Sequence, residues 1–141
     1  MTTKICSFNI RRLTNLTSED LKYRPAVNQV EINWFNPQPA LVSWSKENGV
    51  LLEAYSPLGS LGVKQALEVQ AVKGVAKQLG ISPAQVMLSW LHQRGIVILP
   101  KSANTERIKE NLEGQDERTH HPRETDMKPP YFSVPAATRR I

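Results

Sequence analysis

The chain has 141 residues, of which 40% are hydrophobic and 22% are charged, a composition typical of a single soluble globular domain. No apolar run approaches the roughly 20 residues that a membrane span needs, and the N-terminal residues MTTKICSFNI contain no apolar core of a secretory signal. Cys6 is the single cysteine, which excludes an internal disulfide and favours a reducing, cytoplasmic compartment.

The net charge of +5 raises the question of a nucleic-acid partner. Residues 1–112 hold 13 Lys and Arg against 8 Asp and Glu, whereas residues 113–141 hold 5 of each. The basic residues are scattered, and no run of them is interleaved with aromatic residues. We therefore expect no nucleic-acid partner, because an anionic small ligand explains a modest positive bias equally well.

Strands and helices are predicted to alternate along the chain. The strands are expected at residues 3–8, 26–33, 50–55 and 96–99. The helices are expected from Asn9 towards Leu21, from Pro39 to Asn48, along the stripe Leu67, Ala71, Val75 and Leu79, from the Ser82 N-cap to Gly95, and after Asn104. This alternation predicts an α/β fold with a parallel sheet, either open or part of a (β/α)8 barrel.

Two helix and strand signals are particularly specific. Ser82 and Gln85 form a capping box, with Pro83 at the first helical position. The four apolar residues from Ile96 to Leu99 predict a strand that is buried on both faces.

The segment that follows this last strand predicts an anion site. Pro100 ends the strand, and Lys101, Ser102 and Asn104 then lead into a helix that carries Arg107. A helix N-terminus offers free N–H groups and a positive dipole end, and Lys and Arg side chains add charge that suits a phosphate. A second set of polar side chains, Gln29 and Glu31, shares one face of the second strand.

Four motifs give the chain a specific resemblance. VNQVEIN at residues 27–33, YSPLGS at 55–60, GISPAQVMLSWLHQRG at 80–95 and LPKSANTERIKEN at 99–111 together resemble the C-terminal part of an aldo-keto reductase. Members of that family are (β/α)8 barrels that use NADPH to reduce aldehydes and ketones. The resemblance implies a partial TIM barrel, with strands five to eight and their helices in residues 1–112. Residues 113–141 are rich in proline and show little periodicity, so we expect an irregular or disordered tail there.

The same resemblance implies a role for each motif residue. Gln29 resembles the residue that hydrogen-bonds the nicotinamide carboxamide, and Tyr55 resembles the aromatic that stacks on the nicotinamide ring. Ser56, Leu58 and Ser60 match the loop around the pyrophosphate. Lys101, Ser102, Asn104 and Arg107 match the group around the 2′-phosphate, and Glu110 and Asn111 match the residues that read the adenine.

The chain also departs from the family pattern. The family motif glycine-valine-serine-asparagine-phenylalanine is replaced by Lys4-Ile5-Cys6-Ser7-Phe8, and Gly62 stands where some relatives carry an aspartate that latches the loop over the cofactor. The catalytic Asp, Tyr, Lys and His of the family belong to the first half of the barrel and have no counterpart here. The expected substrate of a full-length parent is a small carbonyl compound, whereas this chain is expected to be inactive by itself.

Simpler interpretations remain open for several of these residues. Tyr55 could be a packed aromatic at a strand end, Gln29 and Glu31 polar filler inside a barrel, and Lys101 and Arg107 solvated charges. Trp34, Trp44 and Trp90 are expected in the core, and no metal site is expected. The alternative function is a non-catalytic nucleotide-binding or oligomerising half-barrel, which would self-associate through its exposed edges.

Overall fold

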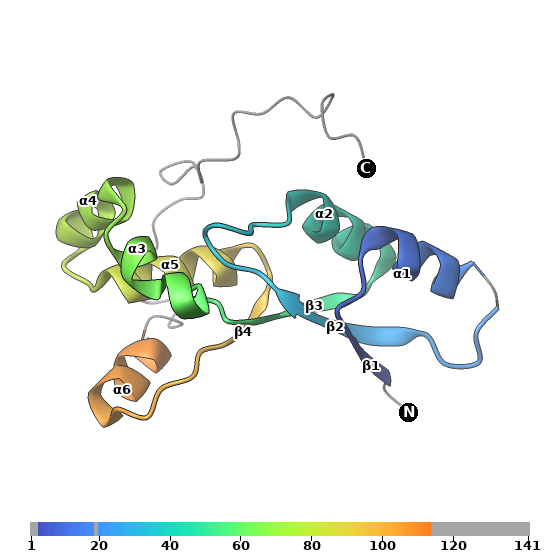
Figure 1. Ribbon diagram of the computed structural model, residues 1–141. Coiled ribbons are helices and arrows are strands. Elements are labelled where there is room, and N and C mark those ends of the chain that lie inside the picture. Colours follow the sequence, from blue (N-terminus) through green and yellow to red (C-terminus); the bar gives the residue numbers. More distant parts are fainter. Residues whose placement is uncertain (1–2, 19, 114–141) are drawn as a thin grey trace.

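The computed structural model describes residues 3–18 and 20–113 (Figure 1), so the predicted tail lies outside the described residues from position 114 onward. The elements in chain order are β1 (Thr3–Cys6), α1 (Ile10–Thr17), β2 (Pro25–Glu31), α2 (Pro39–Asn48), β3 (Leu51–Tyr55), the 3₁₀ turn η1 (Ser60–Gly62), α3 (Val63–Leu67), α4 (Gln70–Leu79), α5 (Pro83–Gln93), β4 (Val97–Leu99) and α6 (Thr105–Glu113).

The strands of the described region form one parallel sheet in the order β1-β2-β3-β4, which confirms the predicted α/β fold. Successive strands are neighbours, and at least one helix connects each strand to the next. β1 and β4 are the two edges of this sheet within the described residues. Because the strands are parallel, all four of their C-terminal ends lie at the same end of the sheet, which is where parallel α/β folds bind their ligands.

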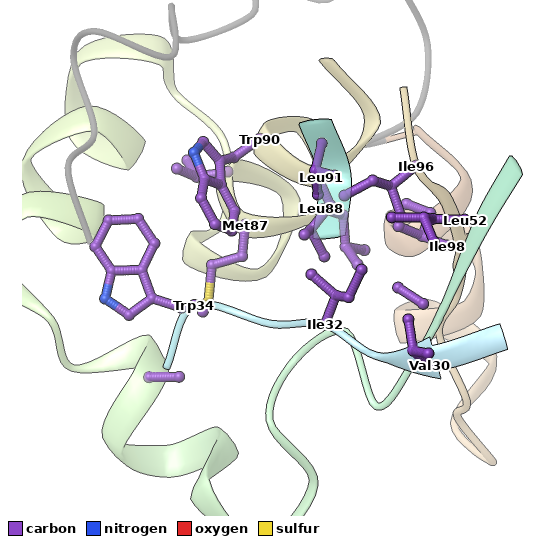
Figure 2. Packing of buried hydrophobic residues seen from close by; sticks show 14 of the residues in the cluster. Val30, Ile32, Trp34, Leu52, Met87, Leu88, Trp90, Leu91, Ile96 and Ile98 are labelled. Atoms are coloured by element: carbon purple, nitrogen blue, oxygen red, sulfur yellow. The ribbon is translucent and has the colours of Figure 1, made fainter. Parts of the chain in front are cut away.

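One face of the sheet packs against helices and forms the hydrophobic core (Figure 2). Every second strand residue points to this face, and Val30, Leu52 and Ile98 are each at most 6% exposed. The helices contribute apolar residues to the same cluster, among them Leu13 from α1, Leu41 from α2, and Leu88 and Leu91 from α5.

Two tryptophans close one end of this core, as predicted. The rings of Trp34 and Trp90 meet edge to face, with centroids 5.4 Å apart and planes inclined at 62°. Trp44 is half-buried and packs against the same cluster. Edge-to-face pairs of this kind stabilise a core beyond the area that they bury.

The opposite face of the sheet is open. Leu51, Val97 and Leu99 point to it and are 46%, 40% and 40% exposed. The prediction that Ile96–Leu99 is buried on both faces is therefore wrong for the second face, because no element of the described region covers it. Ile96 and Ile98 are buried as expected.

Most predicted helices are confirmed, with corrections at two places. The capping box of α5 is present, with Ser82 accepting from the backbone N–H of Gln85 and Gln85 accepting from that of Ser82. α1 ends at Thr17, before Leu21, and the hydroxyls of Thr17 and Ser18 donate to carbonyls of its last turn.

The second correction concerns the stripe from Leu67 to Leu79, which belongs to two helices. Val69 has extended backbone angles (φ −60°, ψ 121°), and α4 starts after it. This change of direction rotates the helix, so that α4 buries Val72, Val75 and Ala76 while Ala71 is exposed. No helix in the described ranges is long and apolar enough to cross a membrane.

Candidate functional site

The parallel register places Gln29, Tyr55 and the starts of the segments at 55–60 and 99–107 near the C-terminal ends of the strands. Gln29 pairs with Cys6 on one side and with Glu53 on the other, and Tyr55 pairs with Glu31 and Leu99. The segments that leave β3 and β4 therefore start next to each other. Residues 55–60 and 99–107, far apart in the sequence, begin on neighbouring strands of one edge.

Gln29 and Tyr55 share the open face of the sheet on neighbouring strands. Gln29 is half-buried, and Tyr55 is 37% exposed at the end of β3. In the register, Gln29 lies opposite Glu53, two residues before Tyr55. The two residues predicted to contact the nicotinamide are thus diagonal neighbours on one surface, and the ring of Tyr55 is available to a ligand there.

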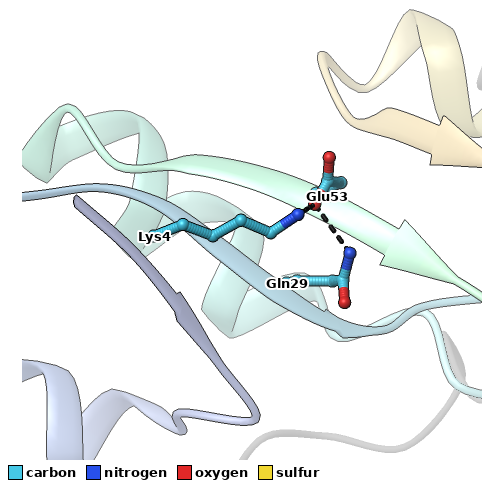
Figure 3. A network of polar contacts seen from close by, with 3 residues as sticks. All are labelled: Lys4, Gln29 and Glu53. Carbon is cyan, nitrogen blue, oxygen red and sulfur yellow. Dashed lines mark hydrogen bonds and ion pairs between the residues drawn. The ribbon is translucent and has the colours of Figure 1, made fainter. Parts of the chain in front are cut away.

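A polar network crosses three strands on this face (Figure 3). The Nζ of Lys4 on β1 forms an ion pair with Oε2 of Glu53 on β3, and the Nε2 of Gln29 on β2 donates to the same oxygen at 2.8 Å. The hydrogen bond from Lys4 lowers the pKa of the Glu53 carboxyl; burial raises that pKa, and Gln29 and the Lys4 charge lower it. Glu53 is therefore ionised at neutral pH.

Sequence reasoning did not predict that Lys4 and Glu53 take part in a polar network with Gln29. The alternation of LLEAY puts Glu53 on the face of Tyr55, and this signal was readable in the sequence. The pairing of Glu53 with Gln29 depends on the register of β2 against β3, which the sequence alone does not specify.

The loop after β3 is tightly folded. Ser56 and Ser60 both have φ of 48°, and Gly59 has φ of 91°. The backbone N–H of Gly59 donates to the carbonyl of Ser56 at 2.8 Å, and that of Gly62 donates to Gly59 at 2.8 Å. Two non-glycine residues in the left-handed region store backbone strain, a feature that clusters at ligand-binding sites.

The three predicted loop residues differ in exposure. Leu58 packs against the hydrophobic core and anchors the loop, Ser56 is half-buried, and Ser60 is exposed. Asn33, two residues after the end of β2, supports the loop, because its Nδ2 donates to the carbonyl of Ser56 at 3.4 Å and to the carboxylate of Glu31 at 3.1 Å. Sequence reasoning did not assign Asn33 this role.

The junction between β4 and α6 presents cations and helix N–H groups to solvent. Lys101 and Arg107 are exposed, and neither forms an ion pair within the described residues. Asn104 caps α6, with its Oδ1 accepting from the N–H of Arg107 at 3.0 Å. Ser102 accepts from the N–H of Asn104 at 3.2 Å. Glu106 is an acidic residue in the same first turn.

Glu110 and Asn111, the predicted adenine readers, have different surroundings. Glu110 is exposed, and its backbone carbonyl accepts from Gln85 Nε2 of α5 at 3.3 Å, which joins α6 to the core. Asn111 is buried, with 8% of its surface exposed. The Glu110 side chain is therefore accessible to a ligand, whereas only a small part of Asn111 is exposed.

Comparison with known proteins agrees with the resemblance of the four motifs. The model of the Aldo/keto reductase family matches residues 3–118. An aldehyde reductase of Saccharomyces cerevisiae is 43% identical over 109 residues, which cover 77% of this chain and 35% of that protein. An NADP(+) glycerol 2-dehydrogenase of the same yeast is 43% identical over 108 residues, covering 76% of this chain and 34% of that protein.

Solved structures give the same result. An aldo-keto reductase from a Medee basin deep-sea metagenome library is 35% identical with a TM-score of 0.79, covering 86% of this chain and 43% of that one. An aldo-keto reductase complexed with NADPH is 32% identical with a TM-score of 0.73, covering 82% and 37%. The chain spans about a third of the length of the curated relatives named above. Because the family model matches well over half of its residues, the chain belongs to the aldo/keto reductase family.

Proposed function

We propose that this chain is the cofactor-binding part of an NADPH-dependent aldo-keto reductase. In this proposal β1 to β4 correspond to strands five to eight of a (β/α)8 barrel, and the open face of the sheet is the side that faces the barrel interior. The parallel sheet with one helix-covered face and the similarity to aldo-keto reductases support this assignment.

The observation that carries the proposal is the exposed junction between β4 and α6. A dianionic 2′-phosphate needs several donors and positive charge, and this junction combines Lys101, Arg107 and the first N–H groups of α6. Neither cation is neutralised by a carboxylate within the described residues. The donor set thus fits NADPH better than NADH, which lacks this phosphate.

The remaining residues would hold the rest of the cofactor. Tyr55 would stack on the nicotinamide, and Gln29 would hydrogen-bond its carboxamide. Ser56, Leu58 and Ser60 would surround the pyrophosphate, and Glu110 and Asn111 would contact the adenine. NADPH would supply a hydride to a small carbonyl substrate. The proton donor and its partners belong to the other half of the family barrel, so we expect no carbonyl reduction by the isolated 141-residue chain.

Calorimetric titration with NADPH and NADH tests the proposal. We expect NADPH to bind the chain more tightly than NADH, and Arg107→Ala to weaken NADPH binding about 10- to 100-fold, as loss of a charge-assisted hydrogen bond does. The affinity for NADH should stay within about twofold of the unsubstituted chain, because a cofactor without the 2′-phosphate has no partner for Arg107.

Lys109→Ala is the matched control for this experiment. Lys109 is an exposed cation on the same helix, and it forms an ion pair with Glu113 at 3.9 Å. Its removal changes the charge of α6 equally without removing a predicted phosphate ligand. Equal affinity for the two cofactors, or equal effects of the Arg107 and Lys109 substitutions, would contradict the proposed 2′-phosphate site.

The open face supports a second candidate, a half-barrel module that associates with another half. Leu51, Val97 and Leu99 are large apolar residues that share this face and are at least 40% exposed. Burying them against a second copy of the chain is favourable. Sedimentation of the chain as a stable monomer would exclude this candidate.

Two sets of substitutions show which surface of the chain forms the interface between copies. Replacing Leu51, Val97 and Leu99 by Ser or Thr should shift the chain to monomer, whereas replacing Ile108 and Leu112, the exposed apolar residues of α6, should not. Association that survives the first set and fails with the second would place the interface on α6 instead.

From the single exposed Cys6 we also infer a reducing, cytoplasmic location.

A further inference from the structure

We propose that Lys4 and Glu53 are positioning residues that fix the side-chain amide of Gln29, with its carbonyl oxygen directed to a ligand on the open face. The site would then select a ligand that donates a hydrogen bond there, such as the primary carboxamide of a nicotinamide. This inference rests on the proposed cofactor, and it adds two residues that control how the cofactor is read.

The chemistry of the three side chains determines the orientation of the amide. An ionised carboxylate only accepts hydrogen bonds, and an ammonium group only donates them. Gln29 therefore has to turn its NH₂ group to Glu53, and it does so with Nε2 2.8 Å from Oε2. Turning the amide over would place its carbonyl oxygen against a carboxylate oxygen, which is repulsive.

The fixed amide leaves one acceptor for a ligand. Within the residues that the structure describes, no protein group donates to Oε1 of Gln29. The side chain is half-buried on the face that also carries Tyr55. A nicotinamide stacked on Tyr55 would bring its carboxamide to this neighbouring strand, where an N–H of the ligand would meet Oε1.

Lys4 stabilises the orientation of the Gln29 amide by favouring the ionised form of Glu53. Its hydrogen bond lowers the pKa of Glu53, so the carboxylate remains ionised, and therefore an acceptor, to a lower pH than it would without Lys4. A protonated Glu53 could donate instead, and it would then permit the opposite orientation of Gln29. Lys4 occupies the position of a glycine in the family motif, so the ion pair is a property of this chain rather than of that motif.

Binding measurements with three ligands test the orientation. The ligands are NADPH, its 3-acetylpyridine analogue, in which a methyl group replaces the amide NH₂, and adenosine 2′,5′-bisphosphate, which lacks the nicotinamide. The unsubstituted chain should prefer NADPH over the analogue by about 3- to 10-fold, the usual effect of one hydrogen bond.

Glu53→Gln should reduce this preference to near unity. A glutamine at position 53 can accept or donate, so Gln29 can turn its NH₂ to the carbonyl of the analogue. The affinity for adenosine 2′,5′-bisphosphate should not change. Glu68→Gln is the matched control, because it removes the carboxylate of the Lys73–Glu68 ion pair, and it should leave the preference intact.

Lys4→Met provides an independent variant with a pH readout. Without Lys4 the pKa of Glu53 rises, so the preference for NADPH should be lost at a higher pH than in the unsubstituted chain when the pH is lowered. A role of Lys4 in fold stability alone would weaken all three ligands together and would not move this midpoint.

The outcomes separate the two proposals. If the bisphosphate binds but the preference is absent, or persists unchanged in Glu53→Gln, the assigned orientation of Gln29 is wrong while the cofactor site stands. If the bisphosphate does not bind, the proposed cofactor is overturned together with this inference.

Discussion

The two faces of the sheet are built from the same strands and differ in nearly every physical property. Leu52 and Ala54 of β3 point to the helices and are at most 3% exposed, whereas Leu51 and Tyr55 of the same strand are 46% and 37% exposed. The helix-facing side is mainly apolar and is covered by the chain's own helices. The open face combines apolar residues with the Lys4–Glu53–Gln29 network.

This difference separates what stabilises the molecule from what it offers to a partner or ligand. Residues of the covered face have lost their contact with water, so their contribution to the free energy of unfolding is already present in the chain. Residues of the open face are still in contact with water, so they would contribute free energy only when a ligand or another protein surface buries them. Substitutions on the two faces should therefore differ in size and in the property that they change.

The largest difference in unfolding free energy is expected between leucine-to-alanine substitutions at the adjacent positions 51 and 52. Leu52→Ala should lower the free energy of unfolding by about 2–5 kcal/mol, because it removes buried methyl groups and leaves a cavity. Leu51→Ala should cost less than about 1 kcal/mol, because this side chain is already half in water. Urea unfolding of both variants is the measurement, and similar losses would show that the open face is buried in solution.

A substitution of Asn28 tests whether the helix-facing side of the sheet also holds the loop that follows β1. It is fully buried, its Oδ1 accepts from the backbone N–H of Phe8 at 3.4 Å, and its Nδ2 donates to the carbonyl of Phe8 at 2.9 Å. Asn28→Ala should cost about 1–3 kcal/mol, because two backbone groups of the loop after β1 lose their partners.

Asn48→Ala is the corresponding control in the same unfolding measurement. Asn48 is exposed and donates to the carbonyl of Trp44 at 2.8 Å, where water can replace it. We expect a change within about 0.5 kcal/mol. A loss as small for Asn28 would mean that water reaches its position, and that the loop is held by other contacts.

A substitution in the capping box of α5 tests how much a helix N-cap contributes to the stability of the helices that cover the sheet. Ser82→Ala should destabilise the chain by about 1 kcal/mol, because the N–H of Gln85 loses its acceptor at 3.2 Å. Ser43→Ala in α2, an exposed helical position, should be neutral or slightly stabilising, since alanine has the higher helix propensity. Thermal unfolding of both variants compares a cap with an ordinary helical serine.

Residues with a local signal could be predicted from the sequence, and residues defined by the register could not. The side chains of Ser82 and Asn104 suit the start of a helix, and the structure confirms both helix boundaries. The strand at Val97–Leu99 was also found, but its apolar run gives no sign of which face stays open. The partners Lys4, Gln29 and Glu53 come from three strands up to 49 residues apart, so only the folded sheet joins them.

The pH dependence of stability gives the smallest expected effect, and it isolates the open face. The pKa of Glu53 lies below its ordinary value, chiefly because of the hydrogen bond from Lys4. The ionised carboxylate therefore stabilises the folded state at a pH above the unfolded pKa, which is about 4.3, and this contribution is lost as the pH falls through the lower folded value. Since Lys4 is half exposed, water screens the pair, and we expect a contribution of only about 0.2–1 kcal/mol.

Glu53→Gln should abolish this part of the acid sensitivity, whereas Glu68→Gln in the exposed Lys73–Glu68 pair should change it less. Unfolding free energies measured from neutral pH down to about pH 3 compare the two variants with the unsubstituted chain. A steeper acid loss in the Glu53 variant would reverse the sign argued here. It would mean that burial, which raises the pKa of Glu53, outweighs the hydrogen bond from Lys4, which lowers it.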